Sequence, residues 1–123
     1  MRLARLLALA ACLVLTACSA PPGRHAAQAA CDAYAKTVTT AAQGDAARAA
    51  AQKDADLAAS ADPSWSALQR DIKDVYALAA ANAAAHNAGH VVDQEKMNAY
   101  VAADKRVRAD CASAGRDLGP LQP

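Results

Sequence analysis

The sequence predicts an all-α protein, a small antiparallel four-helix bundle, and three features of the 123-residue chain lead to that prediction. Alanine fills about a third of the chain, well above its ordinary share, and alanine has the highest helix propensity of all residues. Four segments carry apolar residues at the spacing of a helix face, and none shows the alternation of a strand. The cysteines Cys31 and Cys111 then indicate how many helices the bundle has.

Composition limits the core and the classes of function. Hydrophobic residues make up 54% of the chain, but there is no Phe, one Trp and three Tyr, so the abundant alanines each bury little area. Beyond Arg2 and Arg5 at the start, the acidic and basic side chains nearly balance. No basic stripe with interleaved aromatic residues is present, so we expect no nucleic-acid partner.

Residues 1–17 are predicted to be a signal segment. Arg2 and Arg5 give it a positive start, and residues 6–15 form an apolar run without a charge. Such a run is too short for a permanent membrane-spanning helix, which needs about 20 residues. It matches the apolar region of a secretory signal peptide, which implies an exported protein.

The run ends in Leu15-Thr16-Ala17-Cys18, which resembles the lipobox of bacterial lipoprotein signal peptides. The resemblance implies that residues 1–17 are removed and that the Cys18 thiol takes a diacylglyceryl group as a thioether. Two or more acyl chains, such as palmitate, anchor a protein stably in a membrane. We therefore expect a cell-membrane location on the extracytoplasmic face. Cleavage after Ala17 with plain secretion is the alternative.

The residue after Cys18 bears on which membrane holds the anchor. In bacteria with two membranes an Asp at this place often marks retention in the inner membrane, and this chain has Ser19 instead. That favours the outer membrane where one exists. The Ala-, Arg- and Asp-rich composition equally fits a single-membrane organism of high GC content, so both alternatives stay open.

The exported part divides into three segments. Residues 18–24 hold the lipidated cysteine and a tether, because Pro21, Pro22 and Gly23 disfavour a helix. Residues 25–115 form the helical bundle domain. Residues 116–123, with Gly119 and two prolines, are predicted to be a flexible C-terminal tail.

The first two helices are predicted over residues 25–43 and 45–61. Gly44 is expected to end the first helix, since glycine commonly follows the last helical residue, and Asp45 is expected to cap the second. The expected core face of the first helix is Ala27, Cys31, Tyr34, Val38 and Ala41. The expected face of the second is Ala47, Ala50, Asp54, Leu57 and Ala61.

The last two helices start at strong signals. Asp62 is the expected N-cap of a helix that runs to residue 87, with Pro63 in the first turn. Asp93 is the expected N-cap of a helix that Gly115 ends, with Val92 and Met97 at the spacing of a hydrophobic staple. The expected core face of the helix after Asp62 is Trp65, Leu68, Ile72, Val75 or Tyr76, Ala79 and Ala83. The expected core face of the helix after Asp93 is Met97, Tyr100, Asp104, Val107, Cys111 and Ala114.

Gly44 could also lie inside one long helix, and the cysteines decide between three and four helices. An even pair of cysteines in an exported protein predicts a disulfide between Cys31 and Cys111, with two buried free thiols as the alternative. The two residues share an end of an antiparallel bundle only if the number of helices is even. With three helices they would lie about 25 Å apart, whereas a disulfide needs Cα atoms within about 7 Å. The pair therefore predicts four helices.

Candidate ligand sites each have a plain structural alternative. His86 and His90 have the spacing of two metal ligands on a helix, but Gly89 between them favours two solvated histidines at a membrane-distal tip. We therefore predict no metal site and no cofactor. Asp54 and Asp104 fall on apolar faces, which indicates either a polar pocket or, as we favour, helices turned so that both reach solvent.

The remaining polar and aromatic residues suggest no chemistry. The aromatic residues are expected to be core rather than the lining of a ligand cleft: Trp65, Tyr34, Tyr76 and Tyr100. Asp71 and Asp74 are expected to be solvated. No catalytic triad, phosphate loop or carboxylate pair is recognisable, so we predict that the protein is not an enzyme. The expected function is a non-catalytic binding or interaction module with an envelope protein as a partner. The alternative is binding of a small ligand or metal at the distal tip or in a bundle cleft.

Overall fold

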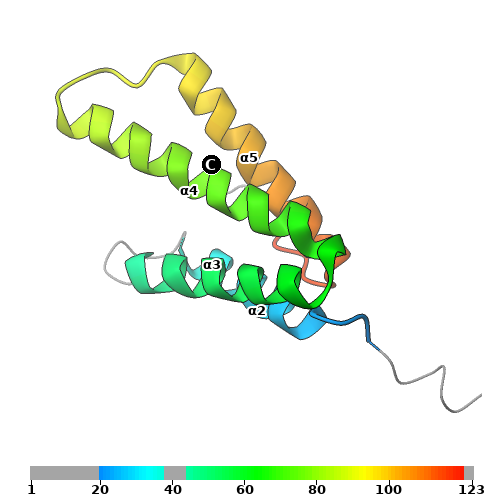
Figure 1. Cartoon of the computed structure of the whole chain (residues 1–123). Helices are drawn as coiled ribbons and strands as arrows, with labels where there is room; N and C mark the ends of the chain where they lie inside the picture. Colours follow the sequence, from blue (N-terminus) through cyan, green and yellow to red (C-terminus); the bar gives the residue numbers. More distant parts are fainter. Residues whose placement is uncertain (1–19, 38–43, 121–123) are drawn as a thin grey trace, which may run out of the picture.

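The computed structural model describes residues 20–37 and 44–120, which form four α-helices and no strand (Figure 1). The elements are α2 (Arg24–Lys36), α3 (Gly44–Ala61), the short 3-10 helix η2 (Pro63–Trp65), α4 (Ser66–Asn87) and α5 (Gln94–Ser113). Helices α2 and α3 pack along each other as one hairpin, and α4 and α5 form the second. Among the described helices, none has the length and apolar character needed to cross a membrane.

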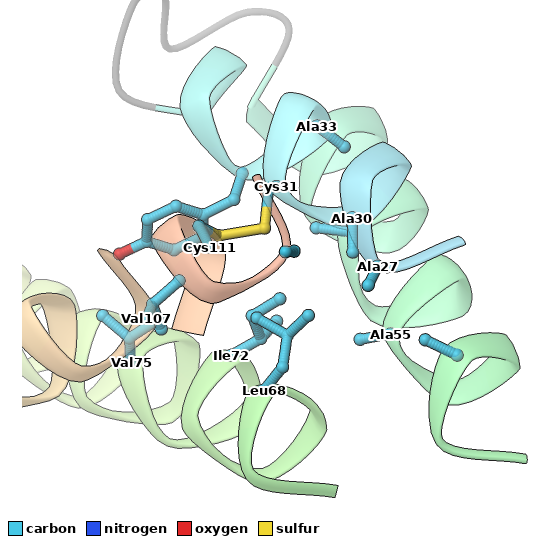
Figure 2. Close-up of a cluster of buried hydrophobic side chains, with 14 of the residues drawn as sticks. Ala27, Ala30, Cys31, Ala33, Ala55, Leu68, Ile72, Val75, Val107 and Cys111 are labelled. Carbon is cyan, nitrogen blue, oxygen red and sulfur yellow. A yellow bond between two sulfur atoms is a disulfide. The ribbon is translucent and has the colours of Figure 1, made fainter. Parts of the chain in front are cut away.

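A disulfide joins the first and last of these helices. The Cα atoms of Cys31 on α2 and Cys111 on α5 lie 5.7 Å apart, and the two residues are separated by 80 positions in the sequence. Both side chains are fully buried, and Figure 2 shows the bond within the apolar cluster. The bond and the even number of helices confirm the prediction from cysteine placement.

The two hairpins are close at one end of the bundle and diverge towards the other (Figure 1). We call the end with the disulfide the closed end; there α3 leads into α4 and α5 terminates. At the open end α4 and α5 rise away from α2 and α3. The first hairpin contributes Tyr34 to the core, whereas the larger aliphatic side chains come from the second hairpin: Leu68, Ile72, Val75 and Val107.

The buried face of α3 differs from the predicted face. Ala51, Ala55 and Ala58 are buried, whereas Leu57 is 53% exposed, so the predicted face was wrong. Alanine lies on every side of this helix, and the spacing of apolar residues therefore carries little information. A face of alanines lets α2 approach α3 closely, because the distance between packed helices depends on the side chains at the contact.

The close approach extends to the start of α2. Gly23 has a φ of 76°, and a Cβ atom there would lie 2.7 Å from the carbonyl oxygen of Ala58. Only glycine fits this backbone conformation without strain. The Trp65 Nε1 atom donates to the Pro22 carbonyl at 3.0 Å. The described part of the predicted tether therefore lies on the closed end, and α2 begins at Arg24, one residue earlier than expected.

Most of the predicted helix ends are confirmed. The Asp62 carboxylate accepts from the Ser64 backbone N–H at 2.9 Å, and Asp93 accepts from that of Lys96 at 2.8 Å. Gly89 and Gly115 follow α4 and α5 with φ values of 76° and 88°, as glycines after a helix do.

Two predictions for residues near the open end were wrong: the role of Gly44 and the burial of Met97. Gly44 is the first residue of α3 and has no positive φ, so it does not end the first helix in the predicted way. Helix α2 ends at Lys36, and the predicted core residues Val38 and Ala41 lie outside the described residues. The predicted core residue Met97 is 41% exposed, and the buried residues of α5 begin at Ala103.

The C-terminal segment contacts the bundle as far as the structure describes it. Arg116 pairs with Asp32 of α2 at 3.0 Å, and Leu118 packs against the core. The segment 116–123 was predicted to be a flexible tail; within it Arg116 and Leu118 make these contacts, and residues 121–123 lie outside the described part.

Candidate functional site

The divergence of the hairpins leaves two adjoining cavities at the open end, which together we call the cleft. The inner cavity has a volume of about 90 Å³. Its lining residues are Tyr34, Thr37, Arg48, Val75, Tyr76, Ala79 and Tyr100. The outer cavity, of about 220 Å³, is lined by Ala79, Asn82, Met97 and Tyr100. All four helices contribute, and Ala79 and Tyr100 border both cavities.

The three tyrosines gather at the cleft. The rings of Tyr34 and Tyr76 lie 5.8 Å apart between centroids, and Tyr34 is buried while Tyr76 and Tyr100 are half-buried. The prediction of an aromatic core is confirmed for Tyr34, whereas Tyr76 and Tyr100 pack against the core but are only partly enclosed. Trp65 lies at the closed end, against the tether, and does not belong to the cleft.

Burial keeps these phenols protonated. It raises the pKa of Tyr76 to about 12, with the neighbouring Thr37 hydroxyl and, less strongly, the charge of Arg48 acting in the opposite direction. Burial also raises the pKa of Tyr100, and a hydrogen bond to Asp104 adds to the effect of burial on the pKa of Tyr34. Their hydroxyl groups are therefore hydrogen-bond donors at any physiological pH.

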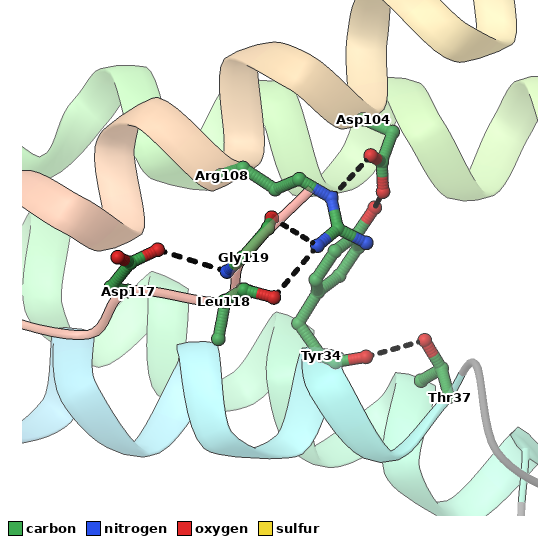
Figure 3. A network of polar contacts seen from close by, with 7 residues as sticks. All are labelled: Tyr34, Thr37, Asp104, Arg108, Asp117, Leu118 and Gly119. Atoms are coloured by element: carbon green, nitrogen blue, oxygen red, sulfur yellow. Dashed lines mark hydrogen bonds and ion pairs between the residues drawn. The ribbon is translucent and has the colours of Figure 1, made fainter. Parts of the chain in front are cut away.

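A buried carboxylate holds the inner wall of the cleft. Asp104 is 1% exposed and accepts from the Tyr34 hydroxyl at 2.6 Å and from the Arg108 guanidinium at 2.6 Å (Figure 3). The expectation that Asp104 reaches solvent was wrong, because these two donors replace water around the carboxylate. The i+4 partner Arg108 was visible in the sequence, whereas Tyr34 is 70 residues away. Asp54, the other candidate, is half-buried.

The same guanidinium reaches the C-terminal segment. Arg108 donates to the carbonyl oxygens of Leu118 and Gly119 at 3.0 and 2.9 Å (Figure 3). Arg108 of α5 is thus connected to Tyr34 of α2 through Asp104, and it bonds directly to the C-terminal segment. The network fixes the orientation of Tyr34, whose ring forms part of the cleft.

Two polar atoms in the cleft walls are buried without a hydrogen-bond partner: the Tyr76 hydroxyl and the Asn82 Oδ1 atom. The Thr37 hydroxyl, also in the inner cavity, donates to the Tyr34 carbonyl at 2.7 Å. Buried polar groups normally have a partner, which a water molecule or a ligand can supply. The cleft therefore has hydrogen-bonding capacity that the described protein atoms do not use.

A second polar cluster lies between α4 and α5 at the closed end. Asp71 is 2% exposed and pairs with Arg70 at 2.9 Å and Arg106 at 3.4 Å. Asp110 lies beside it, and burial together with the Asp71 carboxylate raises the pKa of Asp110 to about 6. The two arginines lower the pKa of Asp71 despite its burial. The prediction that Asp71 is solvated was wrong, because α5 supplies Arg106 and Asp110 across the hairpin.

The remaining candidates do not form a site in the described residues. His86 and His90 are exposed, and Gly89 places His90 beyond the end of α4. The described residues contain no group of three or more His, Cys, Asp or Glu side chains placed to hold a metal ion. Cys18 lies outside the described residues, so its lipidation stays a prediction.

The sequence alone identified some residues that line the cleft but not that they lie together. The three tyrosines and Asn82 could be listed from the sequence, but only the angle between the hairpins brings them together.

Comparison of the chain with family models, curated proteins and solved structures found no match in any of the three.

Proposed function

We propose that this chain is a lipid-anchored protein of the cell envelope, on the extracytoplasmic face of a membrane, and that its helical domain is a non-catalytic binding module. The lipobox-like stretch ending at Cys18 supports the anchor, and the Cys31–Cys111 disulfide suits an oxidising compartment outside the cytoplasm. The cleft at the open end is the proposed binding site.

The observation that carries the binding role is the unused hydrogen-bonding capacity of the cleft. Ligand sites are concave, largely apolar and contain a few polar groups that fix orientation. The cleft has this composition, with tyrosine rings and Met97 around the unpartnered Tyr76 hydroxyl and Asn82 Oδ1. A ligand that brings a polar group of its own can pair with these two atoms.

The anchor is tested by replacing its cysteine. Metabolic labelling with an alkyne palmitate should mark the wild-type protein and leave Cys18→Ser unlabelled and released from the membrane fraction. Cys12→Ser is the matched control, because it lies in the segment expected to be removed and should be labelled like the wild type. Membrane-bound Cys18→Ser protein without label would contradict the anchor.

The binding role is tested by filling the cleft. Ala79→Leu places a larger side chain between the two cavities, and Ala84→Leu makes the same change on the exposed side of α4. Native mass spectrometry of protein from its own membranes should detect a small molecule bound to the wild type and to Ala84→Leu, and none bound to Ala79→Leu. Equal occupancy of both variants would place the ligand elsewhere.

A second candidate is contact with an envelope protein through the turn between α4 and α5. Val91 in this turn is 94% exposed, and His86 and His90 beside it are exposed as well. A photo-crosslinking residue at position 91 should capture one discrete partner in intact cells, while the same residue at the exposed position 50 should not. Identical capture patterns from the two positions would contradict this role.

A further inference from the structure

The inner cavity places a positive charge beside an unused hydroxyl. Arg48 and Tyr76 both line it, and the charge of Arg48 is close enough to act on the Tyr76 phenol. The Tyr76 hydroxyl is buried and donates to no described group. A guanidinium and a phenol that converge on one space are hydrogen-bond donors suited to a carboxylate.

The negative charges near this cavity leave Arg48 available. Its Nη2 atom pairs with Asp45 at 2.6 Å, but the Asp45 side chain is 96% exposed. An exposed pair of this kind contributes little free energy, so an incoming anion can share the guanidinium, which has five N–H donors. The other carboxylate nearby, Asp104 behind Tyr34, is already balanced by Arg108 at 2.6 Å.

The outer cavity is different in character. Ala79, Met97 and Tyr100 give it an apolar wall, interrupted by Asn82. Its volume is about 220 Å³, and an apolar cavity of about 150 Å³ takes up a benzene molecule. It therefore has room for a short apolar group of about six to eight carbon atoms, and it adjoins the polar inner cavity along Ala79 and Tyr100.

From this juxtaposition we propose that the cleft binds an amphipathic carboxylate. The carboxylate group lies in the inner cavity between Arg48 and the Tyr76 hydroxyl, and the short apolar body lies in the outer cavity against Met97 and Tyr100. This proposal rests on the proposed binding role of the cleft and adds the chemical class of the ligand.

Calorimetry with three probes of equal chain length tests it: octanoate, octanol and octylamine. Octanoate should bind about tenfold more tightly than octanol, the effect of a charged hydrogen bond, and octylamine should bind most weakly. Arg48→Gln should remove the preference for octanoate over octanol. Arg48→Lys, which keeps the charge but loses the planar fork, should retain part of the preference.

Two further variants complete the test. Tyr76→Phe should weaken octanoate binding more than octanol binding, because an ionised carboxylate is a stronger hydrogen-bond acceptor than an alcohol oxygen. Lys53→Gln is the matched control for the loss of one positive charge on α3, since Lys53 is exposed and outside the cleft, and it should bind all three probes like the wild type. Circular dichroism checks that each variant is folded.

The outcomes separate the two proposals. If octanol and octanoate bind equally well, the cleft is a binding site but the assignment of a carboxylate is wrong. An octanoate preference that survives Arg48→Gln also overturns the assignment. If none of the three probes binds to the wild type, the proposed cleft function fails together with the ligand class.

Discussion

The closed end and the open end of this bundle are built from the same helices but are held together differently. At the closed end the Cys31–Cys111 disulfide crosses a core of aliphatic side chains, and the described N-terminal and C-terminal segments pack on it. At the open end Tyr34, Asp104 and Arg108 form a buried polar network, and the cleft lies beside it.

An alanine-rich bundle has little apolar area to bury, and the two ends use it differently. Alanine faces let α2 and α3 pack closely but bury little area, so most of the hydrophobic stabilisation comes from a few larger residues near the disulfide. The covalent bond fixes one end of the hairpins, and the other end can then diverge and leave polar atoms unpaired. Departures from good packing are expected where a protein has a function.

The largest effect should come from breaking the closed end. Cys31→Ala with Cys111→Ala removes a bond that spans 80 residues of sequence, and the chain-entropy model gives a loss of about 4 kcal/mol. Because small domains have only about 5–15 kcal/mol of stability, the melting temperature should fall steeply. Calorimetric scans of the variant and of the reduced wild type should agree. A melting temperature unchanged by complete reduction would contradict the account.

The next effect should come from the polar network of the open end. Asp104→Ala leaves the Arg108 guanidinium and the Tyr34 hydroxyl without their buried acceptor, and breaking a buried pair costs about 3 kcal/mol. Asp56→Ala is the control, because that carboxylate pairs with Lys73 at a half-exposed site and should cost less than about 1 kcal/mol. Urea unfolding measures both, and equal losses would show that the network is not a structural centre.

The buried tyrosines should make the open end sensitive to alkali. In the unfolded chain tyrosine ionises near pH 10, whereas in the fold the pKa of Tyr76 is raised to about 12 and that of Tyr34 is raised as well. Above pH 10 the unfolded state therefore releases protons that the folded state keeps, and stability falls as the pH rises. Absorbance at 295 nm should show part of the tyrosine titration coinciding with unfolding. Titration of all three tyrosines near pH 10 in folded protein would be the opposite result.

The smallest effect should come from the carboxyl pair at the closed end. The pKa of Asp110 is raised to about 6 in the fold, above the unfolded value of about 3.9, so its contribution to stability is present at low pH and is lost as the pH rises through 6. Asp110→Asn imitates the protonated form. It should raise the free energy of unfolding at pH 7.5 by about 1 kcal/mol, since the site is partly solvated. At pH 3, below the unfolded pKa, the variant and the wild type should match, and destabilisation at pH 7.5 would contradict this pKa.

The sequence predicted the closed end well and the open end poorly, for physical reasons. The disulfide, the cap at Asp62 and the buried residues near the closed end depend on local signals or on one covalent constraint, and the structure confirms them. At the open end the local cap at Asp93 is confirmed as well, but the predicted core residues Ala83 and Met97 are exposed. The face of α3 was wrong because alanine surrounds that helix and its periodicity distinguishes no side.

The polar interior could not be predicted because its partners are distant in the sequence. Asp104 was placed on an apolar face, but its donor Tyr34 lies 70 residues away, and Asp71 meets Arg106 across 35 residues. The cleft depends on the angle between two hairpins, which no local spacing encodes.

The central claim is that the open end, and not the closed end, is the place where the protein binds its ligand. A titration of uniformly ¹⁵N-labelled protein with octanoate, followed by amide chemical shifts, tests it residue by residue. Saturable shifts are expected at Tyr76, Asn82 and Tyr100, with little change at Cys31, Ile72 and Cys111. Shifts confined to the closed end, or no saturable shift at any residue, would contradict it.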